Sequence, residues 1–419
     1  MRALYRTLWW VALPLLPLRL WWRGRREPGY RALVGERFGR YGAAVPQVRD
    51  VVWIHAVSLG ETRAVTPLVE RILTERPHAT VLLTHMTATG RAAGAALAGP
   101  RVVQAWLPYD VPFAVEAFLA RFAPRVGLLM ETEVWPTLVA ACARRRIPLF
   151  LVNARLSARS LAGYRRFADL TRPTFAALTG VFAQTEADAA RLREAGARHV
   201  SVPGNLKFDL APPADTPARA REMKARIGPR PVWVAGCTRE GEEAMILDAL
   251  ASAALPAGTL TVIVPRHPQR FDEVARLLQE RGVPCARRSE GRDVPPETRV
   301  LLGDSLGELS AYYAASDVAF VAGNLAPLGG HNLLEAIAAG TPTLVGPHTF
   351  NFAAAAREAV AAGAALRVAD APALLREVAA LLDDPARRER MRADGAAFLA
   401  AHRGATSRLW TELSRSIGD

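Results

Sequence analysis

Short apolar runs alternate with longer helical stretches from residue 51 to residue 345 of the chain. Apolar runs of roughly four to eight residues with turn residues at their ends are typical of buried strands. Strands are predicted at 51–56, 80–84, 102–106, 126–130, 148–152 and 180–183, and again at 232–235, 260–264, 299–302, 317–321 and 342–345. The alternation indicates an α/β protein with parallel sheets.

The pattern is interrupted near the middle of the chain. Pro203-Gly204 and Ala211-Pro-Pro213 break it, and the chain of 419 residues, half of them apolar, is long enough for two domains with separate cores. The predicted domains are 23–203 and 217–403, joined by a linker at 204–216. A C-terminal helix at 404–419 is a candidate to cross back onto the first domain. Two similar α/β domains with a central cleft between them are therefore expected.

The N-terminal segment differs from everything after it. The run from Thr7 to Leu18 has no charge, and Trp9-Trp10 and Trp21-Trp22 lie toward the two ends of the apolar stretch. Because about 20 apolar residues are needed to cross a bilayer, the run is short unless Arg19 snorkels. The paired tryptophans are typical of a membrane interface, and the arginines that follow favour the cytoplasmic side.

Two other interpretations of this segment are a buried core helix and a cleaved signal peptide. No small-residue cleavage site precedes Arg23, which disfavours the signal peptide. Residues 1–22 are therefore predicted to anchor the protein to a membrane, with the remainder in the cytoplasm.

Charge and cysteine usage narrow the class of partner. A net charge of +13 and an isoelectric point of about 10.6 indicate an anionic partner. Nucleic acid is disfavoured, because aromatic residues are few outside the N-terminus and the arginines are scattered. An anionic membrane surface or a phosphorylated substrate fits better. Cys142, Cys237 and Cys285 are odd in number and far apart, so they indicate no disulfide framework. The histidines lack the spacing of a zinc site, and no metal or cofactor is expected.

A glycine-rich loop follows the predicted strand 317–321. Gly323, Gly329 and Gly330 permit close approach of the backbone to a ligand, and a helix is predicted next, with Asn332 in its first turn and Glu335 one turn on. A second polar loop, Gly346 to Phe352, follows the next strand. The alternative is an ordinary strand-to-helix turn. Two such loops at successive strand ends favour a nucleotide-linked ligand.

Acidic residues follow two strands of the first half. Glu61 comes just after strand 51–56, where it is either a helix cap or a general base. Glu131 follows strand 126–130 in the same way, and parallel strands would place both carboxylates at one edge. Glu133 is interpreted as first-turn decoration of a helix that begins at Pro136.

Three further candidates are basic or lie in loops. Lys207 is one of only two lysines among 53 basic residues, so chance and a specific need for a compact charge are both possible. Arg266 ends strand 260–264 and suits a phosphate. The segment Gly303 to Leu309 offers another strand-to-helix cradle of N–H groups.

These motifs together resemble a family. WIHAVSLGE, THMTATGR, LPYD, METEVWP, NARLSARS, GNLKFD, GEE, VPRHPQRF, GDSLGEL, AGNLAPLGGHNLLEA and GPHTFNF occur in order, from the N-terminus to about residue 352. They are similar to the 3-deoxy-D-manno-octulosonic acid (Kdo) transferases of lipopolysaccharide inner-core synthesis. The resemblance implies a GT-B glycosyltransferase that uses CMP-Kdo and a lipid A precursor at the cytoplasmic side of the bacterial inner membrane.

The resemblance also implies roles for residues. Glu61 matches the proton acceptor, and Glu131 and Lys207 match residues that stabilise the transition state. The implied CMP contacts are Pro265, Arg266, Leu306, Gly307, Glu308, Asn332, Leu333, Leu334 and Glu335. A single inverting displacement without a metal would follow, in which the helix N-termini after residues 307 and 330 stabilise the departing phosphate together with Arg266, and Lys207 is a further candidate.

Two loops depart from the family pattern. Cys237-Thr238-Arg239 stands where the family usually has Ser-Thr-His, and Ala322-Gly323-Asn324 stands where it has Gly-Gly-Ser. Both departures affect the expected donor contacts. Two other functions stay open at this point: a GT-B enzyme that uses a UDP-sugar with a lipid acceptor, and a nucleotide-binding membrane scaffold without catalysis.

Overall fold

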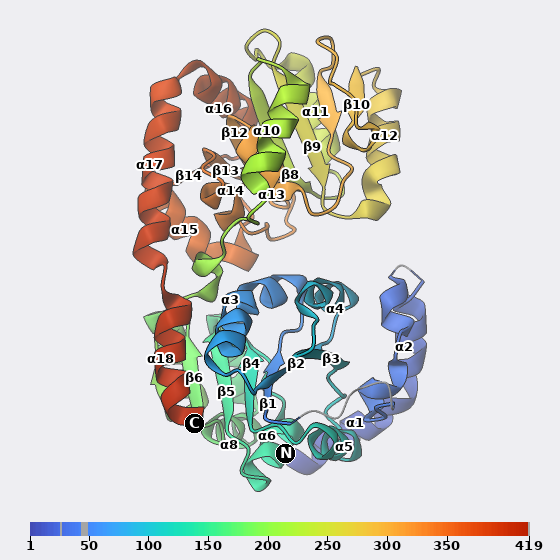
Figure 1. The fold of residues 1–419 in the computed structure, drawn as a ribbon, viewed down its shortest axis with the longest axis vertical. Helices are drawn as coiled ribbons and strands as arrows, with labels where there is room; N and C mark the ends of the chain where they lie inside the picture. Colours follow the sequence, from blue (N-terminus) through green and yellow to red (C-terminus); the bar gives the residue numbers. More distant parts are fainter. Residues whose placement is uncertain (26, 43–48, 418–419) are drawn as a thin grey trace. The chain divides into compact units, whose positions relative to one another are not determined.

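The computed structural model describes residues 1–25, 27–42 and 49–417, and its residues fall into two compact units (Figure 1). Unit 1 comprises Met1–Leu210 and His402–Asp419, and unit 2 comprises Ala211–Ala401. The boundary between Leu210 and Ala211 falls inside the segment 204–216 that the sequence analysis assigns to the linker.

Unit 1 is built on a seven-stranded parallel sheet with the order β3-β2-β1-β4-β5-β6-β7. Its strands are β1 Val51–His55, β2 Thr80–His85, β3 Val102–Trp106, β4 Val126–Met130, β5 Leu149–Ala154, β6 Gly180–Ala183 and β7 Val200–Ser201. Its helices are α1 Arg2–Ala12, α2 Leu16–Arg23, α3 Leu59–Glu75, α4 Ala88–Gly94, α5 Pro112–Phe122, α6 Pro136–Arg144, α7 Ala158–Arg166, α8 Ala168–Ala176, α9 Glu186–Ala195 and α18 Ala405–Ile417.

Alternate residues of the β1 strand enter two different cores. Val51 and Trp53 pack with side chains of α5, α6, α8 and α9, whereas Val52 and Ile54 pack with α3 and α18. The sheet is therefore covered on both faces, as the continuous apolar runs predict. The C-terminal helix α18 is part of unit 1, since Leu409, Trp410 and Leu413 lie in the second of these cores.

Unit 2 has a second seven-stranded parallel sheet, in the order β10-β11-β9-β8-β12-β13-β14. Its strands are β8 Val232–Thr238, β9 Leu260–Pro265, β10 Cys285–Arg287, β11 Val300–Leu302, β12 Val318–Val321, β13 Thr343–Val345 and β14 Ala365–Arg367. Its helices are α10 Thr216–Ile227, α11 Glu242–Ser252, α12 Phe271–Glu280, α13 Leu309–Ala315, α14 Leu334–Ala338, α15 Ala353–Ala361, α16 Ala371–Asp383 and α17 Pro385–His402.

Each strand predicted from an apolar run is present, with ends that agree within three residues. The prediction missed β7, β10 and β14. All three are edge strands of only two or three residues, so they are too short to show a period.

The N-terminal segment differs from the predicted single anchor. It forms α1 and α2, joined by a 3₁₀ turn at Leu13–Leu15, with prolines at the start of the turn and of α2. Among the described residues, no helix combines the length and the apolar character needed to cross a membrane. Leu16 and Leu20 are buried against Tyr30 and Tyr109, so one side of the segment belongs to a core of unit 1.

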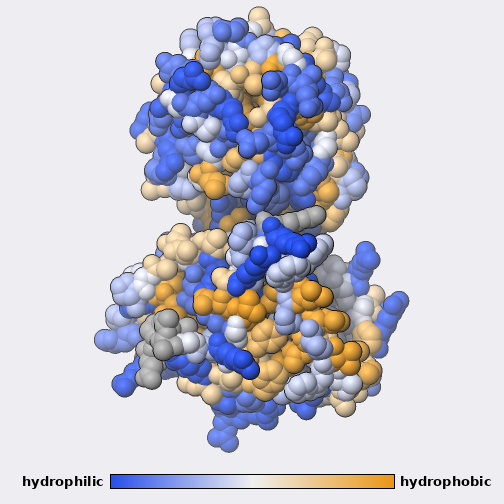
Figure 2. Space-filling view, turned by 90° about the vertical axis from the view of Figure 1, so that its right-hand side faces the viewer, coloured by the Kyte–Doolittle hydropathy of each residue, from blue (hydrophilic) through white to orange (hydrophobic). Residues whose placement is uncertain are grey.

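The other side of α1 and α2 exposes large apolar side chains. Leu4, Leu8, Trp10, Val11, Leu15, Leu18, Trp21 and Trp22 are all close to half exposed or more. Figure 2 shows the hydrophobic patch on this side of unit 1. Exposed apolar patches of this kind mark an interaction site.

Candidate active site

Glu61 lies in the first turn of α3, where it completes a helix cap. The Ser58 hydroxyl and the Val57 N–H donate to its carboxylate at 2.9 and 2.8 Å, and Ser58 Oγ in turn accepts from the Glu61 N–H. The arrangement resembles a capping box, except that the carboxylate accepts from the N–H of Val57, which precedes the N-cap Ser58. The capping interpretation of Glu61 is therefore confirmed, and the carboxylate is still available for chemistry because it is only partly buried.

The environment of Glu61 raises its pKa to about 7, mainly through burial and then through the negative charge of Glu131. The two hydrogen bonds from Val57 and Ser58 lower the pKa but do not outweigh burial. A carboxylate with a pKa near 7 is suited to accept a proton at neutral pH.

Residues of the neighbouring β2–α4 loop hold the loop that precedes Glu61. Thr87 donates through its hydroxyl to the Val57 carbonyl at 2.7 Å and caps α4 at Gly90 N. A Cβ at Gly90 would lie 2.7 Å from the same Val57 oxygen, so only glycine fits there. Thr87 and Gly90 belong to the motif THMTATGR, but the sequence analysis gave them no role.

Glu131 is the centre of a buried ion-pair network. Its two oxygens lie 2.6 Å from Lys207 Nζ and 2.8 Å from Arg155 Nε, and both Glu131 and Lys207 are largely buried. Burial alone would raise the pKa of Glu131, but Lys207 and Arg155 outweigh it and the pKa is lowered. Glu131 therefore stays ionised beside Glu61, and the structure brings the three predicted residues Glu61, Glu131 and Lys207 to one region of unit 1.

Asn153 positions Lys207. Its Oδ1 accepts from the Leu206 N–H at 3.0 Å, at the start of the 3₁₀ turn Leu206–Asp209. Both Asn153 and Glu131 have positive φ, near +51° and +54°, a conformation that costs about 1 kcal/mol or more in a residue with a Cβ. Asn153 lies near the end of β5 and Arg155 follows it. Both residues come directly after the predicted strand 148–152, and this position at a strand end was a signal that the sequence analysis did not use.

Glu133 lies outside the first turn of α6, which begins at Pro136 as predicted. It accepts a hydrogen bond from Trp135 Nε1 at 2.8 Å, and burial, followed by the charge of Glu131, raises its pKa. Trp135 in turn stacks on Trp9 of α1, with ring centroids 6.0 Å apart. The N-terminal segment thus contacts the residues next to this acidic group.

The second region of interest is at the carboxyl ends of the strands of unit 2. Pro265 is the last residue of β9, and Arg266 follows it, with its N–H bonded to the Thr238 carbonyl at 3.0 Å. Among the described residues, no carboxylate lies within ion-pair distance of the Arg266 guanidinium. Its charge is therefore available to an anion.

The loop after β11 places Gly307 and Leu306 at the surface. Gly307 has φ +78°, a conformation that favours glycine, and Leu306 is 72% exposed. Glu308 is buried and pairs with Arg288 at 3.0 Å and with Arg219 at 3.6 Å, so its carboxylate is already occupied by cations.

The loop after β12 differs from the predicted strand-to-helix cradle. Helix α14 begins at Leu334 and has only five residues, so Asn332 precedes the helix and accepts from the Leu334 N–H, while Glu335 is in the first turn. The prediction placed the start of the helix too early, because the apolar residues after Asn332 continue without a break and do not indicate where the irregular backbone ends. The side chains of Leu333 and Leu334 are buried, which leaves only their main chain for a ligand. Gly323, Gly329 and Gly330 do have positive φ, as a close backbone approach requires.

One buried carboxylate joins two loops of unit 2. Glu242 accepts from the N–H groups of Gly323, Asn324 and Leu325 at 2.7 to 2.9 Å, and from that of Arg239 at 3.0 Å. It links the two segments in which this chain departs from the family pattern. Within the second segment, Asn324 Oδ1 also accepts from Gly346 N, which fixes the following loop.

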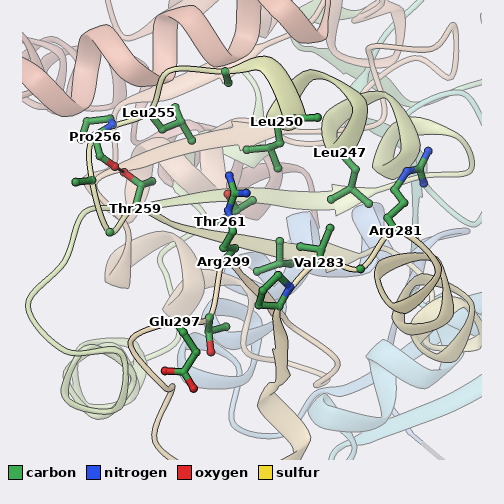
Figure 3. Close-up of a pocket in the computed structure, with 18 of the residues that line it drawn as sticks. Leu247, Leu250, Leu255, Pro256, Thr259, Thr261, Arg281, Val283, Glu297 and Arg299 are labelled. Atoms are coloured by element: carbon green, nitrogen blue, oxygen red, sulfur yellow. Dashed lines mark hydrogen bonds between the residues drawn. The ribbon is translucent and has the colours of Figure 1, made fainter.

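A pocket of about 590 Å³ lies elsewhere in unit 2 (Figure 3). Leu247, Leu250 and Val283 line it together with the charged Arg281 and Arg299. Thr261 and Val300, near the amino ends of β9 and β11, also line it, so it lies at the end of the sheet opposite to Arg266. It is therefore separate from the predicted donor residues.

Comparison with known proteins supplies an independent result. Residues 33–210 match the family described as 3-deoxy-D-manno-octulosonic-acid transferase (kdotransferase), and residues 285–398 match glycosyl transferases group 1. A 3-deoxy-D-manno-octulosonic acid transferase from Bordetella pertussis is 51% identical over 418 residues, covering 97% of each chain. One from Haemophilus influenzae is 36% identical over 413 residues, again 97% of each chain.

Among solved structures, a glycosyltransferase from Rickettsia africae has a similar fold. It aligns with a TM-score of 0.60, at 11% identity, over 89% of this chain and 99% of that one. At this identity the likeness concerns the fold alone.

Proposed function

Since this chain belongs to the 3-deoxy-D-manno-octulosonic acid (Kdo) transferases, a family of glycosyltransferases, we propose that it transfers Kdo from CMP-Kdo to the phosphorylated, acylated glucosamine disaccharide that precedes lipid A. The observation that supports a reaction of this kind is the pairing of Glu61, whose pKa is raised to about 7, with Glu131, which Lys207 and Arg155 keep ionised. Two neighbouring carboxylates with pKa values pushed apart are typical of an acid–base site.

In the proposed reaction, Glu61 removes the proton from the attacking hydroxyl of the acceptor. The oxygen forms a bond to the anomeric carbon of Kdo as the bond from that carbon to the CMP phosphate breaks, so one displacement inverts the configuration. Positive charge develops on the sugar, and the ionised Glu131 stabilises positive charge in its surroundings.

Unit 2 is the proposed donor-binding unit. The guanidinium of Arg266, with no carboxylate partner among the described residues, suits the CMP phosphate. The exposed loop at Gly307 and the main chain at Leu333 and Leu334 offer N–H groups to the nucleotide, in keeping with the positive φ of the loop glycines.

We also propose that the protein works at the bacterial inner membrane, with α1 and α2 in the interface of the cytoplasmic leaflet. The exposed leucines and tryptophans of these helices would enter the acyl region, while Arg6, Arg19, Arg23 and Arg25 would meet anionic headgroups. An acylated acceptor would then lie in the same plane as the enzyme.

The experiment that tests the function is a transfer assay with purified protein, CMP-Kdo and a detergent-dispersed tetraacylated disaccharide bisphosphate. Mass spectrometry of the product should show the added mass of one or more Kdo residues. Transfer from UDP-sugars but not from CMP-Kdo would contradict the proposed donor, and nucleotide binding without any transfer would favour a scaffold.

A further inference from the structure

Three nitrogen-bearing side chains of unit 2 belong to loops that follow neighbouring strands. They are Arg239, just after β8, Arg266, just after β9, and His331, in the loop after β12. In a parallel sheet, β8 is the neighbour of both β9 and β12, and the carboxyl ends of the three strands share one edge. The three side chains therefore belong to one end of the sheet.

Hydrogen bonds between the loops bring these residues closer still. The Arg266 N–H donates to the carbonyl of Thr238, which precedes Arg239. The N–H groups of Arg239 and Gly323 donate to the same oxygen of Glu242, at 3.0 and 2.7 Å. Gly330, which precedes His331, donates to the Gly323 carbonyl at 2.7 Å. The loop after β9 is thus bonded directly to the end of β8, and the loops after β8 and β12 are joined through the carboxylate of Glu242.

His331 has an unmet hydrogen-bonding capacity in this cluster. Its Nε2 atom is buried and has no hydrogen-bond partner among the described residues. The ring lies over Gly323, where a Cβ would come 2.8 Å from Nε2. Burial, followed by the charges of Arg266, Arg239 and His267, lowers the pKa of His331 to about 3. A buried polar atom among cations indicates that an anion belongs there.

The charges of Arg239 and Arg266 are also less compensated than those of Arg270 and Arg288 in the same unit. Arg270 makes a buried two-point pair with Glu243, and Arg288 pairs with the buried Glu308. In the part of the chain that the structure describes, Arg239 pairs with Glu240 alone, which is mostly exposed, and such surface pairs are weak. The ion pairs among the described residues thus give Arg239 one exposed carboxylate and give the Arg266 guanidinium none, while Glu242 is occupied by main-chain N–H groups.

We propose that Arg239 and His331 form a carboxylate subsite beside the phosphate held by Arg266, and that this subsite selects donors whose anomeric carbon bears a carboxylate. The inference rests on the proposed function and deepens it. In a CMP-linked ulosonic acid such as CMP-Kdo, the phosphate and the carboxylate are attached to the same carbon. Such a donor needs two anion contacts side by side, whereas CMP needs one.

The experiment compares CMP with CMP-Kdo on four variants of the full chain. Arg239→Gln removes a surface charge without touching its backbone bond to Glu242, and His331→Gln replaces the buried ring. Arg281→Gln is the matched control, because Arg281 pairs with the exposed Asp248 at the other end of the sheet. Arg266→Ala reports on the phosphate. Calorimetry measures CMP affinity, and steady-state assays measure KM for CMP-Kdo.

Arg239→Gln and His331→Gln should each raise KM for CMP-Kdo by about tenfold or more, because each removes a contact to a charged group. Their CMP affinity should stay within about twofold of the wild type, like that of Arg281→Gln. Arg266→Ala should weaken binding of CMP and CMP-Kdo alike.

Equal losses for CMP and CMP-Kdo would show that Arg239 and His331 hold the phosphate instead, and would overturn the subsite. So would a KM for CMP-Kdo in Arg239→Gln that matches Arg281→Gln; this exposed position gives a result even if His331→Gln fails to fold. A wild-type protein that binds CMP but does not transfer Kdo would instead overturn the proposed function, so the two failures are distinguishable.

Discussion

The two units have closely related sheets but opposite chemistry at the carboxyl ends of their strands. Both sheets are parallel and seven-stranded, and in each a tryptophan of the first strand donates to a threonine of the adjacent strand: Trp53 to Thr84 at 2.8 Å, and Trp233 to Thr261 at 2.9 Å. The candidate residues at the strand ends of unit 1 include the carboxylates Glu61 and Glu131, whereas those of unit 2 include Arg239 and Arg266. The shared architecture therefore does not determine the charge of either site.

The units also differ in which atoms are offered to a ligand. In unit 1 the proposed functional atoms are side-chain carboxylates and an ammonium group, held by side chains such as Asn153 and Ser58. In unit 2 glycines with positive φ expose main-chain groups, and Glu242 holds the loops from behind. A proton transfer needs a tuned side chain, while an anion is bound well by N–H groups and cations.

The largest effect is expected for Glu61→Gln in unit 1. The amide keeps the shape but cannot accept a proton, so turnover should fall roughly 10²–10⁴-fold while CMP affinity is unchanged. Glu70→Gln, at an exposed position of the same helix, is the control. Transfer assays and calorimetry on one preparation distinguish a general base from a helix cap. Near-normal turnover would show that Glu61 acts only as a helix cap.

Lys207→Met tests the ion-pair network. Removing one partner of a buried pair typically costs about 3–5 kcal/mol, but Arg155 still pairs with Glu131, so we expect a loss of about 2–3 kcal/mol in the free energy of unfolding, together with lower turnover. Denaturant unfolding measures the stability. An unchanged midpoint and an unchanged rate would show that Arg155 alone maintains Glu131.

In unit 2, Arg266→Ala should weaken CMP binding by roughly 1.5–3 kcal/mol, because a charge-assisted contact to phosphate is lost. Turnover at saturating donor should fall less than in Glu61→Gln. Calorimetry with CMP provides the measurement, and Arg281→Ala is the control. Unchanged CMP affinity would show that Arg266 is not part of the donor site. It would also contradict the proposed contrast between a proton-accepting unit 1 and an anion-binding unit 2.

The pH dependence of turnover should reflect unit 1. A base must be deprotonated to act, so the rate should rise about tenfold per pH unit up to the Glu61 pKa of about 7 and level off above it. The same raised pKa means that the folded state binds more protons than the unfolded state between about pH 4.5 and 7, so Glu61 contributes less to stability as the pH rises through this range. A rate profile that is flat from pH 5.5 to 8 would contradict the assignment.

The smallest effect concerns the N-terminal segment. Tyr5 donates to the buried carboxylate of Asp110 at 2.8 Å, and Asp110 also accepts from the Thr137 and Leu138 N–H groups. Tyr5→Phe should lower the free energy of unfolding by about 1 kcal/mol, since the other two bonds remain. Thermal unfolding measures it. Deletion of residues 1–22 would remove Tyr5, Trp9 and the buried Leu16 together. We therefore expect the deletion to lower the free energy of unfolding by more than Tyr5→Phe does, in addition to releasing the protein from a membrane.

Much of the fold followed from the sequence for a definite reason. Long apolar runs such as 51–56 and 126–130 have one stable environment, a sheet covered on both faces, so their strands were predicted nearly to the residue. The edge strands β7, β10 and β14 were missed because two or three residues have no periodicity. The five-residue α14 was expected to be a longer helix, because the apolar pattern after Asn332 does not reveal where hydrogen bonding stops.

The sequence by itself determined the alternation of strands and helices, the positions of Glu61, Glu131 and Arg266 at strand ends, and the family. Only the tertiary structure decided which distant groups meet. Arg155 and Lys207 converge on Glu131 from different segments, and Glu242 collects N–H groups from residues about 80 positions away. The tertiary structure also decided that Glu61 has a pKa near 7 while Glu131 is ionised. The pKa of a buried carboxylate depends on the distances to other charges and to water, and these distances exist only once the chain has folded.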